Sequence, residues 1–359
     1  MKYTRLVLAI MATTVFISNQ SHGLNIYEDQ YGHKIDLYGE IGNGGHFNAD
    51  NKYGEFNSDE EFIDDSFASL GIKGTYDKIY YKLEMDYLRE NWQGGSGDMV
   101  LEIDKGYFGY LFTSNHALEM GLTDTAFDDY DSYGDFTFDT TVETGEASDQ
   151  GSTIKYEGQW GYLKFGSSFS FKGKSESGSE LGNVSNGYLG LFTDALSIVA
   201  GLETLQGSQG VSKQGKKNLA GLGLRLNMGN SFSIGLNGFY EEEYLARSRT
   251  PISKASNNDE FTYIYNQYEK LENKGWLVSS KYIFSEKWEL VMSHNYEEYG
   301  QWDEFNTQFG DLTKYTWGKE RVWQTLGINF KPYPSVIIAA EGSVGEADQS
   351  LYAYTRIYF

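Results

Sequence analysis

The chain has 359 residues, a formal net charge of −22 at pH 7 and no cysteine. This acidic balance argues against a nucleic-acid partner, because phosphates are bound by lysine and arginine. Without cysteine, neither a disulfide nor a cysteine-based zinc site can form. Aromatic residues make up 16% of the chain, and 42 glycines stand beside only 3 prolines. This composition is typical of chains whose many strands meet lipid interfaces and turn sharply.

The N-terminal segment has the features of a secretion signal. A positive segment at Lys2 and Arg5 precedes the apolar residues 6–17, and small residues stand just before the expected cleavage point. We therefore predict a cleaved signal peptide over residues 1–23 and a single domain over 24–359. No later apolar run approaches the ~18 residues that a spanning helix requires. The domain is then either soluble in the periplasm or a closed barrel in a membrane.

Runs of alternating polarity recur along the remaining chain. In residues 79–87, apolar side chains alternate with Lys82, Glu84 and Asp86. Residues 218–228 alternate in the same way and put Arg225 on the polar face. A period of two places such sets on opposite faces of a strand. The runs are nine to twelve residues long, which suits a tilted transmembrane strand of ~9–11 residues better than a sandwich strand of ~5–6.

The connections between these runs alternate in length. Short turns are expected at 77–78, 113–116, 158–159, 193–194, 229–230, 285–287 and 332–334. Long polar segments are expected near 48–65, 90–100, 124–150, 172–184, 205–217, 245–271 and 300–319, with a shorter one near 345–348. Short periplasmic turns and long external loops are the rule for outer-membrane barrels. The sequence therefore predicts an all-β fold, a closed transmembrane antiparallel β-barrel of about 16 strands.

The last run, residues 351–359, has an aromatic and charged polar face. Tyr352, Tyr354 and Tyr358 share that face with Arg356, so Tyr354 and Arg356 are candidates for the lumen wall, together with Arg225. Sugar rings stack on aromatic side chains, so such a lumen would suit oligosaccharides. Aromatic girdles at the membrane interfaces are the competing interpretation of these residues.

Three segments resemble the general Gram-negative porins. Residues 25–39, with Asp36-Leu37-Tyr38-Gly39, resemble the start of those proteins, and residues 66–74 resemble their second strand. The terminal Tyr358-Phe359 is similar to the assembly signal that the barrel assembly machinery recognises. The resemblance implies a homotrimer in the outer membrane, surrounded by lipid and lipopolysaccharide. It also implies a water-filled channel for small hydrophilic solutes and ions, narrowed by an inward-folded third loop.

On this resemblance, residues 124–150 are the constriction loop. The segment contains nine acidic residues and no lysine or arginine. The acidic candidates for the pore constriction are Asp124, Asp128, Asp129, Asp131 and Asp135. Carboxylates in a narrow pore would focus a negative field on passing ions, whereas the alternative is a solvated acidic loop. The spacing of the acids does not match a calcium-binding loop, so we expect neither a metal nor a cofactor.

The wall opposite this loop departs from the family pattern. Relatives often carry arginine at the positions of Ser69 and Leu122, as part of a basic ladder that faces the constriction. Lys73, on the same face as Ser69, and Lys155 are the basic candidates that remain. The thinned ladder argues against anion preference, and we expect a mildly cation-selective pore.

Catalysis is not expected from this sequence. The histidines outside the predicted signal peptide are His33, His46, His116 and His294. In that order, they lie before the first run, among glycines, in a short turn, and on a side that faces lipid or a partner subunit. A sugar-selective porin remains the alternative in the transport class. A structural or adhesive outer-membrane barrel is the alternative from another class.

Overall fold

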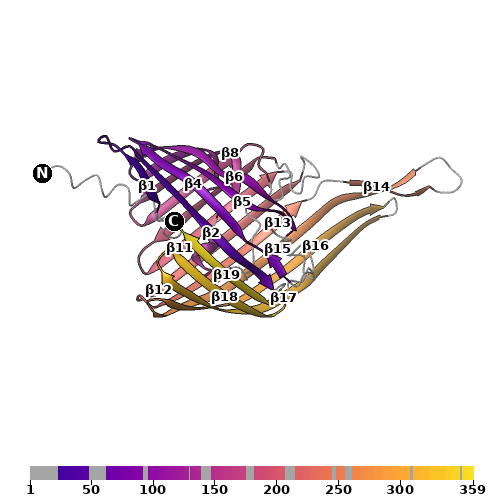
Figure 1. The fold of residues 1–359 in the computed structure, drawn as a ribbon. Helices are drawn as coiled ribbons and strands as arrows, with labels where there is room; N and C mark the ends of the chain where they lie inside the picture. Colours follow the sequence, from indigo (N-terminus) through magenta and orange to yellow (C-terminus); the bar gives the residue numbers. More distant parts are fainter. Residues whose placement is uncertain are drawn as a thin grey trace.

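The computed structural model shows a closed antiparallel β-barrel (Figure 1). It describes residues 23–47, 62–91, 96–128, 130–138, 147–174, 182–206, 215–244, 248–254, 261–307, 310–347 and 350–359. Sixteen strands close the circuit, which confirms the predicted fold class and strand number. Within the described ranges, no helix has the length and apolarity needed to cross a membrane. The signal peptide predicted over residues 1–23 lies outside the described residues, except for Gly23.

The barrel strands follow one another around the circuit in chain order. They are β2 (Lys34–Phe47), β4 (Phe67–Tyr76), β5 (Ile79–Asn91), β6 (Ser96–Thr113), β7 (His116–Asp124), β8 (Asp149–Trp160), β9 (Leu163–Ser170), β10 (Val184–Phe192), β11 (Leu196–Gln206), β12 (Lys216–Met228), β13 (Phe232–Tyr244), β15 (Phe261–Ser285), β16 (Trp288–Thr307), β17 (Gly310–Tyr333), β18 (Val336–Gly345) and β19 (Leu351–Tyr358). The short elements β1 (Leu24–Glu28), β3 (Phe62–Asp64) and β14 (Ser248–Lys254) add to the edges of β2 and β15.

The outer face of the barrel is apolar. Leucine and isoleucine side chains such as Leu101, Leu189 and Leu202 are about 60% exposed there. Leaving such a side chain in water instead of burying it costs about 1.5–3 kcal/mol, so this surface fits a lipid environment.

Exposed aromatic side chains gather near the short turns, at Tyr76, Tyr110, Phe112, Trp160, Tyr162, Phe284, Trp288 and Tyr333. A second set lies near the other ends of the strands, at Phe47, Phe62, Tyr87, Phe169, Phe171, Tyr240 and Trp276. Two such girdles are the signature of a membrane-spanning barrel.

Several predicted connections are wrong in extent. The turn expected at 158–159 lies at Gly161-Tyr162, because β8 continues to Trp160. The long segment expected over 90–100 is mostly strand, since β5 ends at Asn91 and β6 begins at Ser96. The polar segments 245–271 and 300–319 are likewise largely strand. Consequently β15, β16 and β17 extend together past the rim of the barrel (Figure 1). In these extensions the paired strands hydrogen-bond to each other through their backbones. Strand pairing there does not require side chains of alternating polarity, so the sequence pattern did not reveal it.

The barrel closes where β19 meets β2. Tyr358 pairs with Glu40, and the terminal Phe359 exchanges two backbone hydrogen bonds with Gly39, at 3.0 Å and 2.9 Å. The Phe359 ring lies over Gly39, where a Cβ atom would come within 2.6 Å of it. The last residue is therefore part of the sheet that removes both edges of the barrel.

Deleting Phe359 should reduce the amount of assembled barrel more than a similar change in an exposed loop residue such as Ser132. Two backbone hydrogen bonds, worth about 1 kcal/mol each, and the packing on Gly39 are lost. Heat-modifiable migration on electrophoresis measures the folded fraction. Equal folded fractions for the two variants would show that the terminus has no part in closure.

Candidate functional site

The segment between β7 and β8 enters the barrel. Ala126 N donates to Ser168 Oγ on β9 at 3.0 Å, and Phe138 N donates to Glu341 Oε1 on β18 at 2.7 Å. Residues 125–138, of which Asp129 is not described, therefore follow the inner wall from β9 to β18. We call the whole segment 125–148 the inner loop. It is part of the acidic segment 124–150 that the family resemblance predicts to be the constriction loop.

Glycines on the inner wall make room for this loop. A Cβ atom at Gly201 would lie 2.4 Å from the Phe127 ring, and one at Gly221 would lie 2.4 Å from the Tyr130 ring. A Cβ atom at Gly235 would lie 2.1 Å from the carbonyl oxygen of Gly134. These glycines on β11, β12 and β13 form a groove into which the inner loop packs. There Ala126, Phe127 and Tyr130 of the loop form an apolar cluster with Tyr188, Val199 and Leu219 of the wall.

Polar groups hold the loop in this groove. Arg225 on β12 donates from Nε to the Tyr133 carbonyl oxygen at 3.1 Å and from a terminal nitrogen to that of Ser132. The carbonyl oxygen of Gly134 accepts a 2.6 Å hydrogen bond from Ser279 on β15. The guanidinium also lies 5.0 Å from the Phe136 ring, within the range of a cation–π interaction. Arg225, predicted as part of the lumen wall, thus faces inward and contacts the loop.

The predicted acidic residues of the constriction take different positions. Asp124 pairs with Lys105 at the start of the loop, and Asp128 lies beside it, with carboxylate oxygens within 4.8 Å. Asp131 lies in the short 3₁₀ turn η2 (Tyr130–Tyr133), and its backbone carbonyl accepts from Asn237. The Asp135 carboxylate accepts hydrogen bonds from Thr137 at 2.9 Å and 2.8 Å. Asp129 lies outside the described residues.

The wall half a circuit away, formed by β2, β4, β5 and β6, contains a second set of acids. Ser69 on β4 is paired in the sheet with Glu40 on one side and with Asp86 on the other. All three positions have the inward parity of their strands. At the place where the resemblance implies an arginine, the structure therefore has a serine between two carboxylates.

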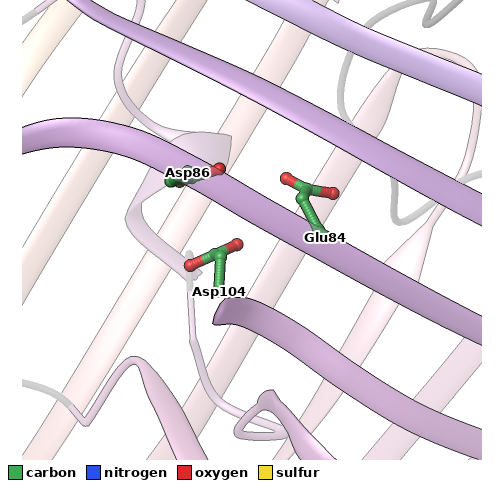
Figure 2. A group of neighbouring side chains, drawn as sticks. All are labelled: Glu84, Asp86 and Asp104. Atoms are coloured by element: carbon green, nitrogen blue, oxygen red, sulfur yellow. The ribbon is translucent and has the colours of Figure 1, made fainter. Parts of the chain in front are cut away.

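More carboxylates surround this point. Figure 2 shows Glu84 and Asp86 on one strand and Asp104 on the next, with their carboxylates around one space. Oxygen atoms of these three groups lie within 4.8 Å of one another. They line a cavity of about 330 Å³ together with Glu40, Asp64, Asp65, Ser66, Phe67, Leu88 and Arg89. We call this surface the acidic wall.

Only part of this negative charge is neutralised by ion pairs. Lys82 pairs with Glu84 at 2.8 Å, Arg89 pairs with Asp64 at 2.7 Å, and Lys105 lies 3.5 Å from Asp104. One carboxylate oxygen of Asp86 is shielded from solvent and has no hydrogen-bond partner within the described structure. Arg356 also lies 4.0 Å from Glu40, so four basic side chains contact the six carboxylates of the acidic wall, which keeps an excess of negative charge next to Ser69.

The predicted basic residues are placed on the inner face but differ in their partners. Lys73 lies 5.1 Å from the Tyr38 ring, on the same face as Ser69. Lys155 on β8 is 8% exposed and pairs with Glu119 at 2.9 Å. An ammonium group that is buried against a carboxylate contributes little positive potential to a pore.

The last strand presents its polar face to the interior. Tyr354 is 3% exposed and accepts a 3.2 Å hydrogen bond from Arg356, which also lies 4.0 Å from Glu40. Tyr352 is 2% exposed and donates to Asp65 at 3.2 Å. Rings covered to this degree offer no open face on which a sugar could stack.

The four histidines among the described residues are engaged in local contacts. His33 pairs with Asp29 at 2.7 Å, and His116 lies 2.7 Å from the Tyr156 hydroxyl. His46 lies against the Tyr352 ring, at 4.8 Å between centroids. His294 lies on the outer face, beside Trp276. These partners do not form the nucleophile, base and orienting group that hydrolysis requires.

Glu40 and Asp104 were not among the predicted site residues, and neither Glu84 nor Asp86 was predicted to lie near Ser69. The alternation of β5 already put Glu84 and Asp86 on the polar face. Their position beside Ser69 depends on the register between β4 and β5. The position of the inner loop could have been predicted from the sequence. Glycines recur at inward positions of β11, β12 and β13, the strands that the loop covers.

Comparisons with known proteins support the fold. No protein-family profile matches the chain, and no curated protein sequence matches it. OmpT of Vibrio cholerae with loop L8 deleted is similar in structure, with a TM-score of 0.62 at 15% identity over 91% of this chain and 99% of that chain. OmpF of Salmonella typhi, in complex with daunomycin, has a TM-score of 0.58 at 14% identity over 93% and 99%. An anion-selective porin from Comamonas acidovorans has a TM-score of 0.57 at 14% identity over 91% and 100%.

At these identities the similarity establishes the fold. The chain is a closed, sixteen-stranded β-barrel of the outer-membrane type, with the architecture that porins share.

Proposed function

We propose that this protein is a porin in the outer membrane of a Gram-negative bacterium. It would let small hydrophilic solutes and ions diffuse passively through a water-filled channel, with a mild preference for cations, and would catalyse no reaction. The apolar outer face with its two aromatic girdles supports the membrane location. The inner loop, which packs along one side of the inner wall, supports a channel whose width is reduced by that loop.

The observation that carries the charge preference is the placement of Ser69 between Glu40 and Asp86. One unpaired charge about 5 Å from a passing ion shifts its energy by about 3 kcal/mol at an effective dielectric constant of ~20, before screening. At physiological salt the screening length is about 8 Å, so a fraction of this energy remains across a narrow pore. The preference should therefore be modest and should increase at low salt.

Assembly and partners follow the same proposal. We propose a homotrimer in contact with outer-membrane lipid and lipopolysaccharide, inserted by the barrel assembly machinery through the terminal Tyr358-Phe359. Participation of Phe359 in the closing ladder supports a role of this terminus in assembly. A similar solved structure, OmpT of Vibrio cholerae, is described in a trimer form.

A reversal potential measured in a KCl gradient tests the charge preference, and two sets of substitutions locate its source. Glu40→Gln with Asp86→Asn removes charge from the acidic wall. Asp128→Asn, Asp129→Asn, Asp131→Asn and Asp135→Asn remove it from the inner loop. We expect the wild-type pore to favour K⁺ and the wall variant to lose more of this preference than the loop variant. A larger loss in the loop variant would show that the acids of the inner loop are the main source of the cation preference. Chloride preference in the wild type would refute the proposed cation preference.

The two alternatives predict different recordings. A sugar-selective porin should be blocked by micromolar oligosaccharide, but the covered Tyr352 and Tyr354 rings argue against it. A structural or adhesive barrel should form no pore. The extension of β15, β16 and β17 past the rim is the observation that favours an external contact surface (Figure 1).

A further inference from the structure

Two carboxylates mark the points where the inner loop leaves and rejoins the barrel. Asp124 is the last residue of β7, Asp149 is the first residue of β8, and the two are partners in the sheet. Their carboxylate oxygens and one of Asp128 lie within 4.8 Å of one another. Like charges at this separation disfavour each other's ionised form. The two ends of the loop at Asp124 and Asp149, which we call its neck, therefore need a counter-ion.

Lys105 on β6 supplies this positive charge. Its ammonium group forms ion pairs with both Asp124 and Asp149 and lies 3.5 Å from Asp104. The side chain is only 12% exposed. A register shift in the β5–β6 ladder, between Glu84 and Met85, lies beside this position, and such bulges re-aim side chains.

Neighbouring cations are engaged elsewhere. Lys155 on β8 pairs with Glu119 and donates to Thr123 at 3.3 Å. No lysine or arginine occurs in the sequence between Lys105 and Lys155. The inner loop therefore contains no base of its own that could replace Lys105 at its neck.

We infer that Lys105 is a positioning residue of the pore: it clamps the two ends of the inner loop and thereby keeps the loop against the wall. This inference rests on the proposed porin function. Asp124 and Asp149 thus hold the two ends of the loop together through Lys105. The width of the pore then depends on an ammonium group that does not belong to the loop. Without that group, Asp124 and Asp149 should separate and the loop should leave its groove.

The test combines charge removal with charge balance. Lys105→Met leaves the two carboxylates without a counter-ion. Lys105→Met with Asp149→Asn removes the repulsion again, and Lys105→Arg retains the positive charge. Lys331→Met serves as the control, because Lys331 on the inner face of β17 forms a 2.8 Å ion pair with Glu289 of β16, across the barrel from β7 and β8.

A single cysteine reports loop position independently of conduction, since the chain has no cysteine of its own. Ala147 is 5% exposed where the loop returns to the wall, and its N–H donates to Glu203 at 2.9 Å. Each variant carries Ala147→Cys, and the rate of modification by a water-soluble thiol reagent is measured in detergent. Single-channel conductance is recorded in parallel on the same proteins.

We expect Lys105→Met to accelerate labelling at least about tenfold, the factor that corresponds to 1.4 kcal/mol, and to raise conductance. The charge-balanced double variant, Lys105→Arg and Lys331→Met should all label slowly. Equal labelling of Lys105→Met and its parent, or no rescue by Asp149→Asn, overturns the inference. If Lys105→Met does not assemble, the double variant decides, because the inference requires it to assemble and to label slowly. A parent protein that labels as expected but forms no pore would refute the proposed function and leave the clamp standing.

Discussion

Replacing Ser69 by arginine should reduce the ratio of K⁺ to Cl⁻ permeability by about three- to tenfold, since tenfold corresponds to 1.4 kcal/mol and one charge at ~5 Å acts with about 3 kcal/mol before screening. The new guanidinium would lie between Glu40 and Asp86, its partners in the sheet. It would neutralise part of the acidic wall and add a positive charge next to the ion path. The reversal potential in a KCl gradient measures the change.

Ser69→Gln is the control for side-chain size. It fills similar space without a charge, so it should lower conductance while leaving the permeability ratio near the wild-type value. The effect of the arginine should also increase at low salt, because the screening length grows from about 8 Å at physiological ionic strength to about 30 Å at 0.01 M. An arginine variant with wild-type selectivity would show that ions do not pass the acidic wall.

Replacing Gly235 by valine should displace the inner loop and raise single-channel conductance. The added Cβ atom would lie 2.1 Å from the carbonyl oxygen of Gly134. This contact is too short, so the backbone of the inner loop must move out of the groove. Overpacking of this kind costs about 1–3 kcal/mol. The loss of the Ser279 hydrogen bond to the same carbonyl, which measures 2.6 Å, adds to this cost.

Gly238→Ala on the same strand is the matched control. An added Cβ atom there would lie 3.8 Å from the Gly275 carbonyl oxygen and 4.0 Å from the Trp276 side chain, so it meets no obstacle. This variant should conduct like the wild type. A Gly235→Val pore with unchanged conductance, but normal assembly, would show that the position of the loop does not limit the passage of ions.

Sequence alternation was sufficient to determine the barrel. A period of two in runs of nine or more residues, joined by connections of alternating length, allows few other ways to satisfy backbone groups in a membrane. It also put Arg225 and Arg356 on the polar faces of their strands, because the side of a strand on which a residue lies depends only on its parity. Strand ends were predicted less well, as the turn at Gly161-Tyr162 shows.

The site depended on tertiary structure for two physical reasons. Which inward residues are neighbours depends on strand register, and register alone brought Glu40 and Asp86 to either side of Ser69. Whether a charge acts on the pore depends on its partner, and the partner can be distant in sequence. Asp124, predicted as a constriction charge, is paired with Lys105 from another strand. The sequence by itself determined the fold, the faces and the acidic excess, whereas the register and the pairing of charges, both properties of the closed barrel, decided where that excess lies.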